Sequence, residues 1–372
     1  MIDKYTDTDI EKEELEGDEI TEPFSPNEID VDITTVNLGY LIGQLKYGEI
    51  DLEPDFQRAS DVWNNTKKSR LIESILLGLP LPSFYFSEDA QTQKLLVIDG
   101  LQRLCAIRDF VLKEEKPLRL KKLQFLKDFE GKRYEDLERP EIRRIDALKI
   151  TVNILRKSTP SDVKYIIFQR INTEGVTLTA QEMRHALNQG IAANFIKELS
   201  ELDSFKKATD NISFKRMQDR DLVNRFIAFY LGYKDYNGAL NNFLNHWMAL
   251  LNKMTAQERD NIKISFESSM KCCYKIFGTE SFRKPNVEGS KRNPISKSLF
   301  DCISVNIAWL PLKEMALLEQ HSQDFKKKLY QLLKTNDSFI TATSKSTGQK
   351  SSVMERFNTI KNLIEKTIGN DK

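Results

Sequence analysis

Histidine and cysteine are both scarce in this sequence of 372 residues, which contains three histidines and four cysteines. The histidines lie far apart without HExxH or HxH spacing, and no two cysteines have the CxxC spacing of a zinc ribbon. A nuclease centre built on a histidine-bound metal is therefore poorly supported. Cys272 and Cys273 are adjacent and poorly placed to pair with each other, so we expect reduced thiols and no disulfide framework.

The sequence also lacks long apolar runs and glycine-rich nucleotide motifs. No stretch approaches the roughly 18 uninterrupted apolar residues of a membrane-spanning helix, and the acidic N-terminus has no apolar signal-peptide core. We therefore expect a cytoplasmic protein without a membrane partner. The GxxxxGK[ST] phosphate loop and the GxGxxG fingerprint are both absent. Ser-His-Asp catalysis stays open, although no pattern marks it.

Charge is distributed unevenly along the chain, although the formal net charge is only +1. Residues 1–32 contain 13 acidic residues and two lysines, a net charge of −11, so the rest of the chain carries +12. We interpret residues 1–32 as an acidic disordered tail, because so polar a segment buries too little apolar surface to fold. Alternatively, the tail shields a basic surface or mimics nucleic acid. The basic body makes DNA a candidate partner.

Hydrophobic periodicity separates a mixed part of the chain from a helical part. The expected strands are 82–86, 95–98 and 150–154. The expected helices are 36–45 and those that begin near Thr66, Gly100, Pro160 and the capping box at Thr179. Residues 113–146 are charged and irregular in pattern, as in an insertion.

From about residue 195 the apolar spacing is nearly all helical, and it ends in a stripe formed by Val353, Phe357, Ile360, Ile364 and Ile368. The expected fold class is α+β, with an N-terminal domain of short strands and helices and an all-helical C-terminal domain. The expected divisions are the tail at 1–32, the N-terminal domain at 33–195 and the helical domain at 196–372.

The strongest local signal is the segment Leu96-Val97-Ile98-Asp99-Gly100-Leu101-Gln102-Arg103. A buried strand ends in Asp-Gly and passes into a helix, and the free backbone N–H groups of such a helix start attract anions such as phosphate. Gly100 allows a close backbone approach, and Arg103 offers a planar fork for phosphate oxygens. Asp99 would hold a metal ion or orient water. The alternative is an ordinary helix start with a surface arginine.

Two further segments carry weaker signals. Arg170 and Asn172 lie where a helix ends, but arginine and asparagine are also ordinary helix C-terminal residues. Glu182 belongs to the capping box, which gives it a structural role. Upstream, Gln57 and Arg58 follow an extended run and would reach a neighbouring ligand.

These three segments, in this order, resemble the N-terminal domain of GmrSD-type restriction endonucleases, also called domain of unknown function 262. The family hallmark is a strand followed by (I/V)DGQQR, matched by residues 98–103 with Leu101 in place of the first glutamine. The F-x-R-x-N-x-x-G-x-x-L-x-x-x-E-x-R pattern is matched by Phe168, Arg170, Asn172, Gly175, Leu178, Glu182 and Arg184. An upstream QR-x-x-x-W-type motif corresponds to Gln57, Arg58 and Trp63, with slightly different spacing.

The family is in turn similar to the ParB/sulfiredoxin fold, which implies a nucleotide site in which Mg²⁺ bridges the phosphates. Residues 52–58 look like the first ParB box and residues 98–106 like the box that binds nucleotide phosphates. The resemblance implies catalytic roles for Asp99, Gln102 and Arg103. It implies nucleotide contacts by Gln57, Arg58, Asp99, Gly100, Arg103, Arg170 and Asn172, and it names no particular metal ligands.

Related domains in phage-restriction systems hydrolyse nucleoside triphosphates and couple this to recognition or cleavage of modified DNA. The resemblance therefore implies a Mg-dependent nucleoside triphosphatase in restriction or anti-phage defence, with DNA and a separate nuclease or partner subunit as further partners. An HNH-type nuclease domain, common in such proteins, is not indicated by these few histidines. Two alternatives stay open: a non-enzymatic DNA-binding or regulatory module, and a metal-dependent DNA nuclease acting through Asp99.

Overall fold

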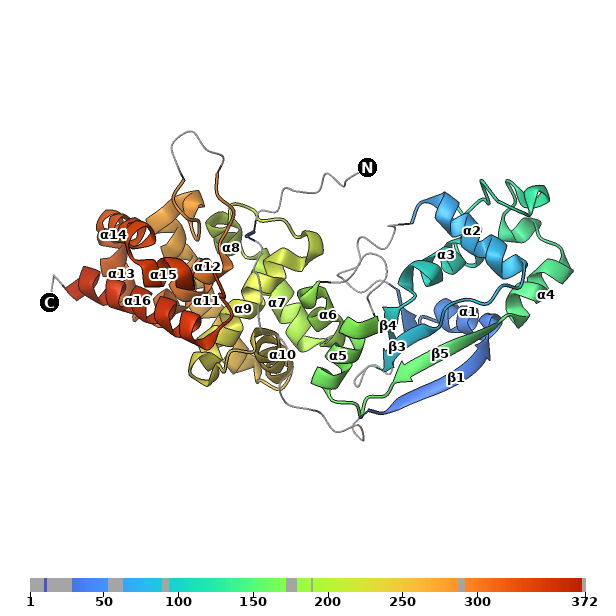
Figure 1. Ribbon diagram of the computed structural model, residues 1–372, viewed down its shortest axis with the longest axis horizontal. Helices are drawn as coiled ribbons and strands as arrows, with labels where there is room; N and C mark the ends of the chain where they lie inside the picture. The colour runs from blue at the N-terminus through green and yellow to red at the C-terminus, as the bar shows by residue number, and fades with distance from the viewer. Residues whose placement is uncertain are drawn as a thin grey trace. The chain divides into compact units, whose positions relative to one another are not determined.

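The computed structural model describes residues 10–11, 29–52, 63–88, 94–171, 179–188, 190–286 and 292–369 (Figure 1). Contacts divide these residues into two compact units at the segment around 178–188, and the short helix α6 (Ala180–Leu187) is split between them. The N-terminal unit contains all the named strands, and the other unit is helical. None of the described helices is long and apolar enough to cross a membrane.

A five-stranded sheet in the order β1-β5-β3-β4-β2 organises the N-terminal unit. Its strands are β1 (Val31–Asn37), β2 (Ile50–Asp51), β3 (Phe84–Glu88), β4 (Leu95–Asp99) and β5 (Lys149–Leu155). β1 is antiparallel to β5, while β3 runs parallel to β5 and antiparallel to β4. The two-residue β2 pairs in parallel with β4. The strand β4, which ends in Asp99, therefore lies between β3 and β2.

Helices α1 (Leu38–Lys46), α2 (Asn65–Leu76) and α3 (Leu101–Val111) share one apolar core with the sheet. Side chains alternate between the two faces of a strand, so Val97 enters this core while its neighbours Leu96 and Ile98 are buried outside it. Helix α4 (Arg139–Ala147) contacts α1 and α2, and α5 (Ser161–Ile171) contacts β4. The core includes Leu41, Ile72, Ile75, Phe84, Phe86, Val97, Leu104, Ile107, Phe110, Ile150 and Val152.

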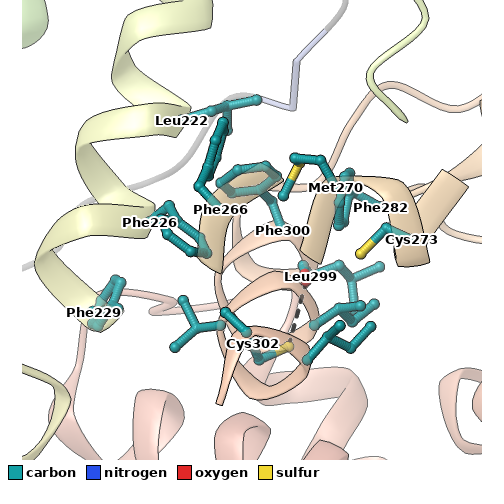
Figure 2. Close-up of a cluster of buried hydrophobic side chains, with 14 of the residues drawn as sticks. Leu222, Phe226, Phe229, Phe266, Met270, Cys273, Phe282, Leu299, Phe300 and Cys302 are labelled. Carbon is teal, nitrogen blue, oxygen red and sulfur yellow. Dashed lines mark hydrogen bonds between the residues drawn. The ribbon is translucent and has the colours of Figure 1, made fainter. Parts of the chain in front are cut away.

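The helical unit has its own apolar core, part of which Figure 2 shows. Aromatic rings pack closely there: the rings of Phe226 and Phe266 are 4.8 Å apart between centroids, in an edge-to-face arrangement. Cys273 and Cys302 are fully buried, and burial raises the pKa of both thiols. The helices are α7 (Ile191–Glu201), α8 (Asp203–Ala208), α9 (Gln218–Gly232), α10 (Leu240–Leu251), α11 (Ala256–Phe277), α12 (Lys297–Ala308), α13 (Leu312–Gln320), α14 (Ser322–Thr335), α15 (Asp337–Ala342) and α16 (Lys350–Ile368).

The expected α+β class is confirmed, with a small sheet in the N-terminal part and helices after it. Strand β1 was not predicted, because its residues alternate only weakly and Ile33 is 68% exposed. Asn64 rather than Thr66 caps α2, accepting a hydrogen bond from the N–H of Lys67. Residue 195, where the sequence places the domain boundary, lies inside α7.

Residues 10–11 and 29–32 of the acidic N-terminal segment lie in the described part of the chain. Residues 31 and 32 begin β1, so the expected disorder is wrong there, and Ile10 and Glu11 contact the helical unit. Ile10 is 4% exposed and joins the helical core. The backbone N–H of Glu11 donates to the carbonyl of Ile295 at 2.8 Å. Most of residues 1–28 fall outside the described residues, so the expectation of a disordered tail stays a prediction there.

Candidate functional site

The candidate site lies where β4 ends and α3 begins. Gly100 is the N-cap of α3 and has φ of 99°, in the left-handed region that glycine adopts readily. A Cβ atom at this position would lie 2.5 Å from the ring of Phe84, so no side chain fits without movement. Because Gly100 has no side chain, it gives the first turn of α3 no side-chain cap. The positive end of an eleven-residue helix is thereby left for another acceptor.

Arg103 lies on the first turn of α3, but its guanidinium is engaged within the protein. Nη2 donates to Asp99 Oδ2 at 2.8 Å and to the Ser83 carbonyl at 3.1 Å, and Nη1 donates to the Pro82 carbonyl. The guanidinium also lies 4.5 Å from the ring centre of Phe84. Burial lowers the pKa of Arg103, and the Asp99 carboxylate partly offsets this. The arginine therefore ties the chain before β3 to the end of β4.

Asp99 remains more accessible than its partner. Its side chain is 35% exposed, whereas that of Arg103 is 11% exposed. The ion pair with Arg103 fixes the orientation of the Asp99 carboxylate where β4 ends and the turn to α3 begins. Asp99 is thus a positioned carboxylate beside a positive helix end, and such a group can orient water or contribute one ligand to a cation.

Gln102 connects this turn to the segment that precedes α2. Its side-chain oxygen accepts a hydrogen bond from the backbone N–H of Trp63 at 3.2 Å. Trp63 is the first described residue after 53–62, and Gln57 and Arg58 lie outside the described residues. The structure therefore shows one end of the upstream motif held at the candidate site.

The second motif is only partly described. Arg170 is exposed near the end of α5, the helix that contacts β4, whereas Asn172 lies outside the described residues. Glu182 is buried in its capping box with Thr179 and pairs with Arg216 at 3.0 Å. Burial raises the pKa of Glu182 more than these partners lower it. Glu182 thus has a structural role at the start of α6.

The final arginine of the second motif, Arg184, is a structural residue of the helical unit. It is 2% exposed, donates to Gln181 and Asn241 at 2.9 Å each, and pairs with Asp221 at 2.9 Å. Sequence reasoning overlooked two partners at the candidate site itself, Phe84 and the Pro82–Ser83 carbonyls. Nothing in the sequence pattern marks them, because their role comes from a contact across the sheet.

The carboxylates near the candidate site are compatible with Mg²⁺ only as single ligands. Within the described residues, no three His, Cys, Asp or Glu side chains gather in a way that could hold a metal ion. This does not conflict with Mg²⁺, which is commonly held by one or two carboxylates together with phosphates and water. Asp99, partly exposed and held by Arg103, fits the role of a single carboxylate ligand.

Comparison with known families supports the resemblance found in the motifs. Residues 38–189 match the family model described as the GmrSD restriction endonuclease, N-terminal domain, so this part of the chain is similar to that domain. The match begins at α1 and includes the sheet from β2 onward, the candidate site and α6. No curated protein and no solved structure matches the chain.

Proposed function

We propose that this chain is a Mg-dependent nucleoside triphosphatase of a restriction or anti-phage defence system. The observation that carries the proposal is the turn from β4 to α3, where a helix start without a side-chain cap lies beside the partly exposed, oriented carboxylate of Asp99. The family match over residues 38–189 supports the restriction setting. A ParB-like arrangement of the motifs and a cytoplasmic location belong to the same proposal.

The backbone N–H groups in the first turn of α3 would donate hydrogen bonds to phosphate oxygens, because Gly100 leaves that end of the helix without a side-chain cap. Arg103 would act chiefly as a positioning residue, since its guanidinium donates to Asp99 and to two backbone carbonyls. It would also contribute positive charge near the phosphates. Gln102 would hold the upstream segment through Trp63.

Asp99 would hold Mg²⁺ or orient the attacking water. The ion, when bound, would neutralise charge on the phosphate oxygens during transfer. Without a cation or a polarised water, an acidic side chain beside a triphosphate would only repel it. Gln57, Arg58, Arg170 and Asn172 are proposed as further nucleotide contacts on the strength of the family motifs.

The proposal is tested by replacing Asp99 with asparagine. Asp99→Asn keeps an oxygen that can accept from Arg103, so the turn should survive while the negative charge is lost. We expect hydrolysis of nucleoside triphosphates to fall by about 10²–10⁴-fold, as for other positioned proton-transfer or water-orienting groups. Nucleotide binding should persist and depend less on Mg²⁺.

Phosphate release and nucleotide binding should be measured on the same preparation, with and without Mg²⁺ and DNA. Asp128→Asn is a matched control, because Asp128 is an exposed aspartate of the same unit. Wild-type turnover in Asp99→Asn would remove Asp99 from the mechanism. DNA retention without hydrolysis would favour the non-enzymatic DNA-binding module, which the +12 charge of residues 33–372 supports. DNA nicking would favour the nuclease.

A further inference from the structure

A cationic pocket lies in the helical unit, in a part of the chain that the family match does not cover. Its volume is about 590 Å³, within the size range of ligand sites. Two lysines, one asparagine and two hydroxyl side chains supply its polar lining, and apolar side chains complete it. The lining residues are Lys284, Pro285, Asn286, Leu333, Lys334, Ile340, Thr343 and Ser344.

An acidic side chain of this same chain already pairs with one of the lining lysines. The ammonium of Lys284 pairs with the carboxylate of Glu11 at 2.7 Å and donates to Ser344 Oγ at 3.1 Å. Glu11 thus occupies the position that an anionic ligand of Lys284 would take. Lys334 is exposed and makes no ion pair with any other described residue.

Glu11 is held in place by its neighbours in the chain. Ile10 forms a parallel bridge with Ile295, and Ile295 in turn forms an antiparallel bridge with Arg283, next to Lys284. The Ile10 side chain is buried in the helical core. These are single-residue bridges, and such backbone pairing is a small-scale form of the strand pairing by which extended peptides bind to proteins.

The stretches that line the pocket and the N-terminal segment carry opposite net charges. The lining residues of the pocket come from two stretches of the chain, residues 281–296 and 322–350. Together these stretches contain ten basic and three acidic residues, a net charge of +7. The N-terminal segment, residues 1–32, carries −11. A run of carboxylates resembles a nucleic-acid backbone in carrying many negative charges along one chain. Lysine and hydroxyl side chains are among the groups that contact backbone phosphates.

We propose that this pocket is a nucleic-acid phosphate site, and that Glu11, on a displaceable acidic segment, occupies its Lys284 in the absence of DNA. Binding of DNA requires the segment to leave, because Glu11 and a phosphate compete for Lys284. A tethered competitor acts at a high effective concentration, so it suppresses weak binding and yields to a ligand with several phosphates. The proposal does not depend on the nucleotide site in the N-terminal unit.

The test uses the full chain and a labelled DNA duplex of mixed sequence, followed by fluorescence anisotropy at low and moderate salt. Ile10→Ser removes the buried anchor without changing the charge, and we expect it to tighten DNA binding by about tenfold through loss of the tethered competitor. Glu11→Gln should tighten binding by about two- to fivefold, the scale of one exposed ion pair. Glu19→Gln, an equal change of charge in the same segment, is the matched control and should have a smaller effect.

Lysine variants locate the site. In the Ile10→Ser background, Lys284→Gln and Lys334→Gln should reverse the gain, while Lys361→Gln, an exposed lysine of α16, should not. Melting curves establish that each variant is folded. Unchanged DNA affinity in both Ile10→Ser and Glu11→Gln, or equal effects of all three lysine variants, would overturn the proposal. Displacement of DNA by inorganic phosphate at matched phosphate concentration would assign the pocket to free phosphate instead and overturn the nucleic-acid part.

Discussion

Arg103 links the candidate site together, because its guanidinium bonds Asp99 at the end of β4 and two carbonyls before β3. The sequence alone marks Asp99, Gly100 and Arg103, because a strand, a glycine and a helix follow one another there. It does not show that Arg103 faces the Pro82 and Ser83 carbonyls. Hydrogen-bond partners from a segment distant in sequence have no local signature. The type of side chain at a position can therefore be predicted, but its hydrogen-bond partners cannot.

Gly100 provides the clearest test at a single residue. Gly100→Ala would place a methyl group 2.5 Å from Phe84 and force alanine into φ of 99°. We expect a loss of about 1–3 kcal/mol in unfolding free energy from the backbone strain alone, and a displaced Arg103. Urea unfolding measures the loss. Gly131→Ala is a useful comparison, since it has φ of 81° with open space around the added atom, and it should cost less.

Whole elements were more predictable than contacts. The strands β3, β4 and β5 lie within two residues of their expected positions, because buried or alternating apolar runs leave a clear pattern. The capping box at Thr179 begins α6 as predicted. Of residues 113–146, expected to be irregular, 139–146 lie in the helix α4. The rest folds mainly through short 3₁₀ turns and loops, and several of its backbone N–H groups donate to side chains of α2.

Glu73 holds that segment from the neighbouring helix α2. Its carboxylate accepts from the backbone N–H groups of Gln124, Phe125 and Leu126 at 2.6–2.9 Å, and the residue is 3% exposed. Burial raises the pKa of Glu73, but these bonds outweigh it and hold the pKa below its ordinary value.

Glu73→Gln would replace one acceptor oxygen by a donor facing backbone N–H groups. We expect it to cost about 1–3 kcal/mol, the range for an unsatisfied buried polar group. Hydrogen exchange of the 124–126 amides should accelerate, and proteases should cut this segment sooner. Glu135→Gln is the control, because Glu135 is 62% exposed and pairs only with Arg133 among the described residues. Equal protection in both variants would show that Glu73 does not hold the segment.

At the scale of the molecule, charged side chains link the helices of the helical unit. Asp221 on α9 pairs with Arg184 on α6 at 2.9 Å and with Lys297 on α12 at 2.7 Å. Deeper in the core, Asp301 pairs with Arg225 and Arg356, all at most 1% exposed. A helical pattern predicts the helices, but it does not predict that such ion pairs replace part of the apolar packing between them.

These links give the helical unit a defined response to acid. Burial raises the pKa of Asp221, but Lys297 and Arg184 outweigh it and hold the pKa well below its ordinary value. The unfolded chain takes up this proton near pH 3.9, the ordinary value for aspartate. The stability from the pair is therefore fully present above that pH and is lost as pH falls towards the lower pKa of the folded state. The pKa of Glu182 is shifted in the opposite direction. Because it is raised, the stability that Glu182 contributes falls as pH rises through its folded-state pKa.

Asp221→Asn separates the contribution of Asp221 to the stability from that of Glu182. At neutral pH we expect it to cost about 3–5 kcal/mol, because it leaves Arg184 and Lys297 without their buried carboxylate. Below the ordinary aspartate pKa the difference in unfolding free energy between wild type and variant should narrow, since protonation removes the same charge from the wild type. Urea unfolding of both proteins from neutral pH down to acid, with Glu182→Gln alongside, measures this. A gap that stays constant with pH would show that the stability of the helical unit does not depend on the charge of Asp221.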